Sequence, residues 1–161
     1  MSDAHYIFLE PSGDGIRDLP ASEIITLMRQ NDDEYWGPYS PVAIIQWGSP
    51  PLYSLFFVRH PRRGWYFEYS SYQEPKRNLV AVQPTEDRPT WVEHWAEGET
   101  AFFLASCFLP QAIAERIVTD FLNSQQPTPT VHWEEFHWTV HRRESPPDDE
   151  SDVVELADPE G

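Results

Sequence analysis

The chain has 161 residues, of which 40% are hydrophobic and 14% aromatic, and its formal net charge at pH 7 is −16. This length fits one domain, and 7 Trp, 7 Tyr and 9 Phe supply enough apolar surface for a core, which excludes a wholly disordered chain. The negative charge argues against direct binding to nucleic acid or to anionic membranes, because both are themselves negatively charged.

The acidic residues are unevenly distributed along the chain. Residues 144–161 contain eight acidic residues and no Lys or Arg, which leaves −8 for residues 1–143. Apart from a small apolar patch at Val153, Val154 and Leu156, this end of the chain is mostly Ser, Pro, Asp and Glu. We therefore predict one α+β domain over residues 1–143 and a disordered acidic tail over residues 144–161.

Two features predict a soluble cytoplasmic protein. Cys107 is the only cysteine, so neither an intramolecular disulfide nor a cysteine-based zinc site can form within one chain, and we interpret it as a buried core thiol. Residues 1–10 lack the basic and apolar regions of a signal peptide, and no stretch approaches the ~20 apolar residues that cross a bilayer.

The N-terminal part predicts a strand and a helix. The apolar residues within 5–10 precede a Pro- and Gly-rich turn at 11–15, which is typical of a strand end. Pro20 suits a first helical turn, and Ile24, Leu27 and Met28 follow at helical spacing, so we expect a helix over 20–30. The run Asn31-Asp32-Asp33-Glu34 would close this helix with acidic residues at its negative end, which is unfavourable and suggests that these charges have another role.

The middle of the chain predicts an antiparallel meander from Val42 to Gln83, because four runs of β-branched and aromatic residues alternate with Pro- and Gly-containing turns. In the third run Trp65, Phe67 and Tyr69 alternate with more polar positions, so one sheet face should be apolar and the other partly wetted. A further hairpin is expected around a turn at Gly98.

The C-terminal part of the domain predicts a second helix and a last strand. Pro110 opens the helix, and Ile113, Ile117 and Phe121 repeat every four residues along it. The last strand spans 131–140, and its large residues change face near Glu134–Glu135, which a bulge or a strand end would explain. Together the elements predict a twisted, mostly antiparallel sheet with two helices, the second packed on one face.

Histidines are the strongest candidates for chemistry, and the best set is His132, His137 and His141. In a continuous strand His137 and His141 would lie roughly 13 Å apart, which is poor ligand geometry, so we predict no metal site. Nucleotide-binding, metalloprotease and serine-hydrolase motifs are absent from the sequence, and we expect neither a cofactor nor an enzyme. A deep pocket lined by histidines and carboxylates would favour the opposite reading.

Basic residues from Arg59 to Arg88 are interleaved with Trp65 and Tyr66, a composition that also occurs in proteins that bind single-stranded nucleic acid. The overall acidity opposes that function. We interpret these residues as hairpin-loop charges that keep strand edges soluble or pair with the acidic tail.

The excess of Trp favours a protein interface, because Trp, Tyr and Arg anchor such surfaces. One loop joins acidic and aromatic residues, although ordinary loop packing would also explain it. The residues that we predict to bind a partner are Asp32, Asp33, Glu34, Tyr35, Trp36, Glu134 and Glu135.

A family resemblance covers residues 60–143. The run Ser106–Pro110, the helix with Ala114 and Phe121-Leu122, and the pattern Pro127-x-Pro129-x-Val131-x-Trp133-Glu134-Glu135 resemble bacterial immunity proteins. These are the immunity proteins encoded beside deaminase-type toxins in polymorphic toxin systems. An aromatic strand like Gly64–Tyr69 also occurs in that family, whereas Gln125-Gln126 departs from its Gly-containing turn.

The resemblance implies a function. It predicts a protein that binds and inhibits a cognate toxin, a deaminase or another enzyme acting on nucleic acid, by occluding its basic active-site cleft. Trp133 is the position carried over from the family, either as a core anchor or as a toxin contact. The alternative is a non-catalytic adaptor or chaperone-like subunit that uses Val153–Leu156 in its acidic tail as a linear motif.

Overall fold

The computed structural model describes residues 5–30, 32–37, 39–48, 50–84, 90–137, 140–147 and 153–156. Its helical elements are α1 (Ala21–Gln30), α2 (Asp33–Trp36) and α3 (Gln111–Ser124), with a 3₁₀ turn η1 (Ala105–Cys107). The larger sheet contains β1 (Tyr6–Leu9), β2 (Gly15–Arg17), β3 (Val42–Trp47), β4 (Tyr53–His60), β5 (Gly64–Ser71), β6 (Arg77–Val82), β9 (Phe108–Leu109) and β10 (His132–Glu135). The smaller sheet contains β7 (Thr90–Ala96), β8 (Glu99–Leu104), β11 (Arg142–Arg143) and β12 (Val153–Glu155).

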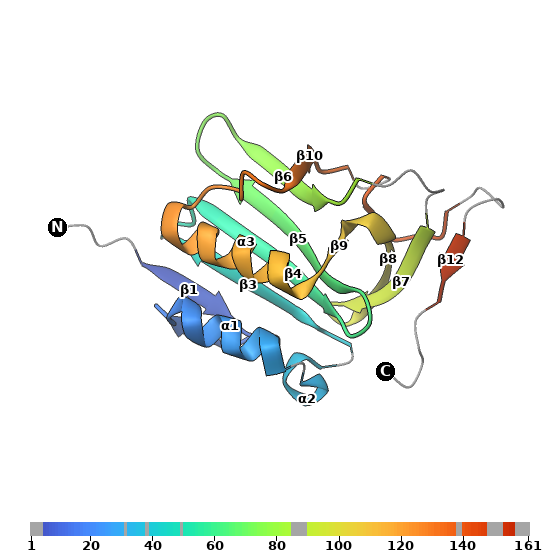
Figure 1. The fold of residues 1–161 in the computed structure, drawn as a ribbon. Helices are drawn as coiled ribbons and strands as arrows, with labels where there is room; N and C mark the ends of the chain where they lie inside the picture. The colour runs from blue at the N-terminus through green and yellow to red at the C-terminus, as the bar shows by residue number, and fades with distance from the viewer. Residues whose placement is uncertain are drawn as a thin grey trace.

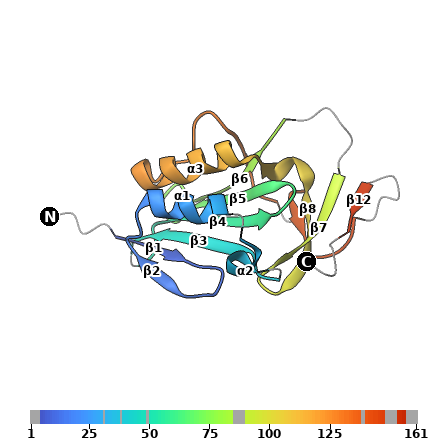
Figure 2. The ribbon, with the colours of Figure 1, turned by 60° about the horizontal axis from the view of Figure 1, so that its bottom comes forward.

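The larger sheet has the strand order β10-β6-β5-β4-β3-β1-β2, with β9 paired to β5, and every one of these pairings is antiparallel. The predicted meander is confirmed as β3 to β6. Both α1 and α3 cover one face of this sheet, and the smaller sheet stands at one end of it (Figures 1 and 2). The fold is therefore α+β with a mostly antiparallel sheet, as the sequence predicts.

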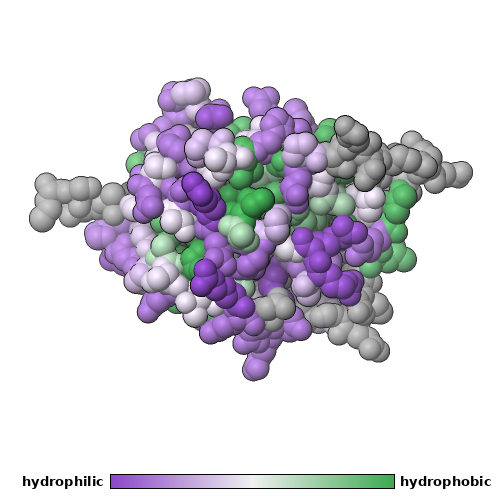
Figure 3. Space-filling model, in the orientation of Figure 1, coloured by the Kyte–Doolittle hydropathy of each residue, from purple (hydrophilic) through white to green (hydrophobic). Residues whose placement is uncertain are grey.

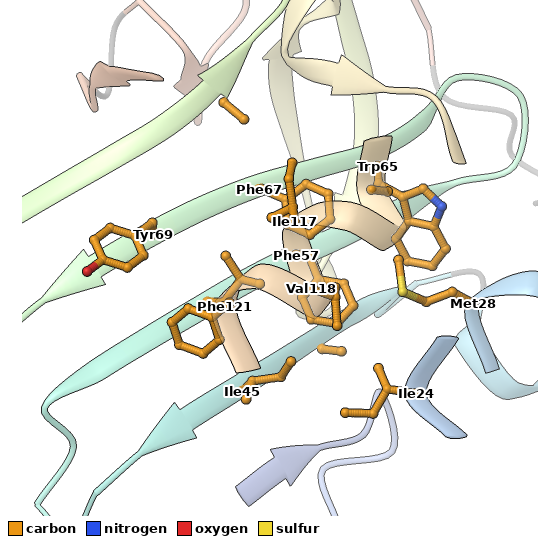
Figure 4. Packing of buried hydrophobic residues seen from close by; sticks show 14 of the residues in the cluster. Ile24, Met28, Ile45, Phe57, Trp65, Phe67, Tyr69, Ile117, Val118 and Phe121 are labelled. Atoms are coloured by element: carbon orange, nitrogen blue, oxygen red, sulfur yellow. The ribbon is translucent and has the colours of Figure 1, made fainter. Parts of the chain in front are cut away.

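The main core lies between the two longer helices and the larger sheet. From α3, the side chains of Ile117, Val118 and Phe121 are buried against Phe57 and Phe67 of the sheet (Figure 4). The predicted repeat of α3 is thus confirmed where it faces the sheet. The first apolar residue of that repeat, Ile113, is instead 36% exposed at the edge of the contact.

The second face of the larger sheet is drier than the alternation in β5 predicts. Tyr66 and Glu68 point away from the helices, yet Tyr66 is fully buried and Glu68 is only 9% exposed. The smaller sheet causes this difference, because Val92 and Phe103 from β7 and β8 pack in one cluster with Tyr66. The expected hairpin at Gly98 therefore forms a separate second layer instead of extending the meander.

The acidic residues after α1 begin a new helix. The Asp32 side chain caps α2 by accepting hydrogen bonds from the backbone N–H groups of Glu34, at 2.9 Å, and Tyr35, at 3.3 Å. Acidic residues at a helix N-terminus interact favourably with the helix dipole. The expectation that these charges close α1 unfavourably is thus corrected.

The C-terminal part also differs from the sequence prediction. The last strand ends at Glu135, so a strand end, and not a bulge, accounts for the change of face, while Trp138 and Thr139 of the expected strand lie outside the described residues. The structure places Val153–Glu155, expected in a disordered tail, as strand β12 beside β7. Residues 148–152 and 157–161 of the expected tail lie outside the described residues.

Candidate partner-binding surface

Trp36 was expected at a surface and instead lies in the core. Its ring is fully buried, makes an edge contact with Trp65 at 4.9 Å between ring centroids, and donates a hydrogen bond from Nε1 to the Leu27 carbonyl at 3.2 Å. Trp36 is the last residue of α2, and the helix is oriented so that this residue faces Phe57 and Trp65 of the sheet. In this structure Trp36 is a structural residue and offers no contact surface to a partner.

The other residues of this predicted cluster lie at the surface. Asp33 is 71% exposed and pairs with the buried Arg59 guanidinium at 2.8 Å, which fixes α2 to β4. Tyr35 is half-buried and donates its hydroxyl to the Glu10 carboxylate at 2.9 Å. Burial and this carboxylate both raise the pKa of Tyr35, so the phenol stays protonated and joins α2 to the end of β1.

Glu134 and Glu135, the second part of the predicted surface, lie on β10 at the opposite edge of the larger sheet from β1 and β2. The two side chains point to opposite faces, because Glu134 is in register with Val80 and Glu135 with Leu79. The seven predicted residues therefore do not form one continuous surface.

Glu134 belongs to a histidine cluster that a continuous strand would not produce. The chain turns after β10, where the His141 N–H donates to the His137 carbonyl, so the His137 and His141 rings stack with centroids 6.1 Å apart. The Glu134 carboxylate contacts His141 at 3.0 Å and His132 at 3.2 Å, and these hydrogen bonds lower the pKa of Glu134. The expected 13 Å separation of His137 and His141 is thus wrong.

Both ring nitrogens of the buried His141 are engaged in this cluster. Nδ1 accepts from the His137 backbone N–H at 3.1 Å, so Nε2 carries the proton that it donates to Glu134. Within the described ranges, no group of three or more His, Cys, Asp or Glu side chains has the arrangement of a metal site. The cluster is a set of hydrogen bonds that fixes the turn after β10.

Two neighbouring hollows lie on the second face of the larger sheet, beside the β7–β8 hairpin. These hollows, of about 550 and 390 Å³, share the residue Glu97 and together form what we call the acidic groove. The aliphatic and aromatic residues of its lining, which we call the apolar floor, are Leu9, Val42, Ile44, Phe56, Ala96 and Ala101. Four acidic residues line it, namely Glu10, Glu97, Glu99 and Glu144, whereas Arg142 is the one basic residue among the lining groups that the structure describes.

The turn of the β7–β8 hairpin places two of these carboxylates. Glu97 and Gly98 both have positive φ, 53° and 84°, and connect the paired residues Ala96 and Glu99, which is the two-residue hairpin turn that suits the twist of the strands. The Gly98 N–H donates to the Tyr39 carbonyl at 2.8 Å, which holds the turn against the segment before β3. Glu97 and Glu99 are both exposed; Glu97 lines both hollows, and Glu99 lines the larger one.

Arg142 closes one end of the acidic groove and is itself neutralised. Its guanidinium pairs with the buried Glu68 carboxylate at 3.0 Å and lies over the Phe56 ring at 5.2 Å. Burial raises the pKa of Glu68, while Arg142 opposes that rise, and the Tyr66 hydroxyl donates to the same carboxylate at 2.5 Å. Because Glu68 already neutralises Arg142, the charge that the groove presents to a partner is the negative charge of its four glutamates.

Arg59, Arg62 and Arg63 of the 59–88 region are each paired with a carboxylate. Arg59 is buried against Asp33, whereas Arg63 and Arg62 contact Glu155 of β12. The expectation that some of these residues pair with the C-terminal segment is confirmed for Arg62 and Arg63. Arg88 lies outside the described residues.

Comparison of the sequence with models of known protein families finds no match, and a search among curated proteins finds no significant relative. In the part of the chain that the structure describes, no helix has both the length and the apolar content to span a membrane. Proposals about function are therefore based on the geometry of the acidic groove and on the sequence pattern.

Sequence reasoning missed all four acidic residues of the groove. Glu10, Glu97, Glu99 and Glu144 come from three separate parts of the chain, and the fold alone brings them to one surface. A signal existed at Glu97-Gly98, since such a pair between two alternating runs marks a hairpin tip.

Trp133 is half-buried beside the core, and its Nε1 donates to the Thr128 carbonyl at 3.0 Å.

Proposed function

We propose that this protein is an immunity protein that binds a cognate bacterial toxin and blocks its basic active-site cleft, with the acidic groove as the contact surface. The observation that carries the proposal is the groove itself, an apolar floor within a rim of carboxylates. The resemblance of residues 60–143 to immunity proteins supplies the class of partner, a deaminase or another enzyme that acts on nucleic acid.

Charge supports this assignment. An enzyme that acts on nucleic acid needs a basic cleft to hold phosphates, and the net charge of −16 on this chain attracts such a surface over long range. The exposed Glu97 and Glu99 would meet basic side chains at short range. Electrostatic complementarity of this kind accelerates association and excludes partners of the same sign.

The apolar floor supports a specific and durable complex. Phe56 and Ile44 are only half-buried, although they lie on a sheet face whose neighbouring positions are covered by β7 and β8. Covering such apolar surface stabilises a complex by about 25 cal/mol per Å² removed from water. In this proposal the carboxylates steer the toxin to the groove, and the floor then slows its dissociation.

The test is co-purification of this chain with the toxin encoded by the neighbouring gene, followed by titration calorimetry at low and high salt. We expect a one-to-one complex whose affinity falls as salt rises. The double variant Glu97→Lys/Glu99→Lys should weaken it by about tenfold or more, because two attractive contacts become repulsive. The absence of any complex at low salt would overturn the proposed function.

Glu135→Lys is the matched control. It makes the same Glu-to-Lys substitution once, which is half the change of charge of the double groove variant, on an exposed residue of β10, at the opposite edge of the sheet and on the helix-covered face. We expect the affinity for the toxin to stay unchanged. A loss with Glu135→Lys and none with the groove variant would move the contact to the surface predicted from sequence.

The alternative function, that of an adaptor, requires a C-terminal segment that can leave the sheet. A linear motif at Val153–Leu156 must be free to enter a partner, so β12 would have to leave β7. An adaptor should lose its partner when residues 145–161 are deleted, whereas the inhibitor, which keeps Glu144 of the groove, should keep most of its affinity. The same calorimetric titration with the truncated chain separates the two functions.

A further inference from the structure

At one edge of the smaller sheet, strand β7 pairs with the protein's own C-terminal segment, β12. The order β11-β8-β7-β12 places β12 beside β7, in parallel register from Val153 opposite Thr90 to Glu155 opposite Val92. β7 has seven residues and β12 pairs with only three of them. Because β11 lies at the other edge, the chain passes from one edge of this sheet to the other before it pairs.

The apolar side chains of β12 contribute little to its attachment. Val153 is 52% exposed, Val154 36% and Leu156 69%. Figure 3 shows the resulting hydrophobic patch over β12 at the right edge of the molecule. Backbone pairing over three residues, with little apolar burial, makes a weak docking unless another contact adds to it.

Glu155 supplies that contact. Its carboxylate accepts hydrogen bonds from Nε of Arg63, at 3.0 Å, and from Nη2 of the same guanidinium, and it lies 3.9 Å from Nη2 of Arg62. The two bonds from one guanidinium are charge-assisted and are stronger than neutral hydrogen bonds. The hydrogen bond from Arg63 also lowers the pKa of Glu155, which keeps the carboxylate ionised.

The turn that carries these arginines is built without help from β12. The Nδ1 atom of His60 accepts from the backbone N–H groups of Arg62, at 3.1 Å, and Arg63, at 3.2 Å. The His60 ring is buried and packs against Phe108 with centroids 5.4 Å apart. The backbone of the turn that carries both arginines is therefore fixed by His60 and does not depend on a docked segment.

We propose that the β7 edge and the Arg62–Arg63 turn form a binding site for an extended segment of another protein. The segment has two β-branched residues followed by a carboxylate and runs parallel to β7. In the free protein its own Val153–Glu155 occupies the site and shows which chemistry fits: backbone pairing for affinity and the carboxylate for register. Strand addition to a sheet edge is a general mode of peptide recognition. This site is independent of the acidic groove and of the inhibitory role.

The internal segment competes with any external one. A tethered segment has an effective concentration in the millimolar range, so an external peptide binds to the wild-type chain only weakly. Weakening the internal strand should open the site, provided that the change leaves β7 and Arg63 intact. Glu155→Gln in the full-length chain meets this condition, because it removes only the charge that Arg63 holds.

The test is fluorescence anisotropy with a labelled peptide that copies residues 151–158. The full-length Glu155→Gln variant should bind this peptide about tenfold more tightly than the wild-type chain does. A peptide that itself carries Glu155→Gln should lose that gain. The double variant Glu155→Gln/Arg63→Gln should not bind, because its edge is open but the partner of the carboxylate is missing.

Two further measurements make the result decisive. Amide hydrogen exchange of residues 153–156 should be faster in Glu155→Gln than in the wild type, which shows that the strand has been loosened, while the exchange of β5 stays unchanged. Glu135→Gln, which removes a charge at a distant strand, should bind the peptide as weakly as the wild type. Equal affinity of the wild type and Glu155→Gln, or no binding to either at about 1 mM peptide, would overturn the proposal.

Discussion

The imidazole rings of His60 and His94 contact each other in a tilted arrangement, with their centroids 4.5 Å apart, at the base of the turn that carries Arg62 and Arg63. His94 donates from Nε2 to the Arg59 carbonyl at 2.7 Å, and His60 accepts from the turn through Nδ1. Both rings are buried, and burial disfavours a charge on either of them. A second proton on His60 would also face Arg62 and Arg63, and one on His94 would face Arg59 and Arg62.

This pair predicts a loss of stability in mild acid. Burial lowers the pKa of His60 to about 4, well below the 6.5 of an unfolded chain, and burial also lowers the pKa of His94. The unfolded state takes up these protons first as the pH falls, so stability decreases from about pH 6.5 toward the folded pKa. We expect His60 alone to lower the free energy of unfolding by about 2 kcal/mol between pH 7 and pH 5, as measured by urea unfolding.

His60→Asn should flatten this dependence, because an amide oxygen can still accept from the turn but cannot titrate. His132→Gln, at an exposed position of β10, is the control and should keep the wild-type pH dependence. An unaltered slope in His60→Asn would show that this pair does not control stability in acid.

Gly64 and Gly98 predict a contrast between two turns. A Cβ at Gly64 would lie 2.1 Å from the Leu109 carbonyl oxygen, where β9 pairs with β5, and φ is +103°. Gly64→Ala should therefore cost about 3 kcal/mol or more, through both overpacking and backbone strain. Gly98 also has a positive φ, but its Cβ would meet nothing within 4 Å, so Gly98→Ala should cost only about 1 kcal/mol. Equal losses in urea unfolding would contradict this contrast.

The Arg142–Glu68 pair predicts that the stability lost on replacing Arg142 depends on pH. Arg142→Met leaves the Glu68 carboxylate buried without that partner and should cost about 3 to 5 kcal/mol at pH 7. Because burial already raises the pKa of Glu68, the carboxylate protonates easily in the variant, and the defect relative to wild type should shrink at pH 5. The double variant Arg142→Met/Glu68→Gln should be less damaged than Arg142→Met alone. A defect that is the same at both pH values would exclude Glu68 as its cause.

Trp36 predicts a separation between stability and binding. Trp36→Ala should cost about 3 to 5 kcal/mol in urea unfolding, because it leaves a cavity beside Trp65 and Phe57. Trp36→Phe should cost less and should leave the affinity for the toxin unchanged, since the ring is not accessible. Reduced affinity for the toxin in a folded Trp36→Phe chain would show that Trp36 takes part in toxin binding after all.

Residue spacing alone is enough to predict the local elements and the class of fold. Helical spacing predicted α1 and α3, and alternating runs between Pro- and Gly-containing turns predicted β3 to β6, because side-chain burial repeats with the period of each element. The αL conformation of Gln125 at the end of α3 shows the limit of such rules, since the chain there accepts a residue other than Gly.

Which residues lie at the surface depends on how the elements pack against one another. Trp36 and Asp33 are close in sequence, yet one is buried and the other exposed, because the orientation of α2 depends on β4 and on the core that it meets. The acidic groove and the docking of Glu155 on Arg63 likewise join residues that are far apart in the chain. Periodicity reports the burial of a residue within its own element, whereas a site depends on which elements the fold brings together.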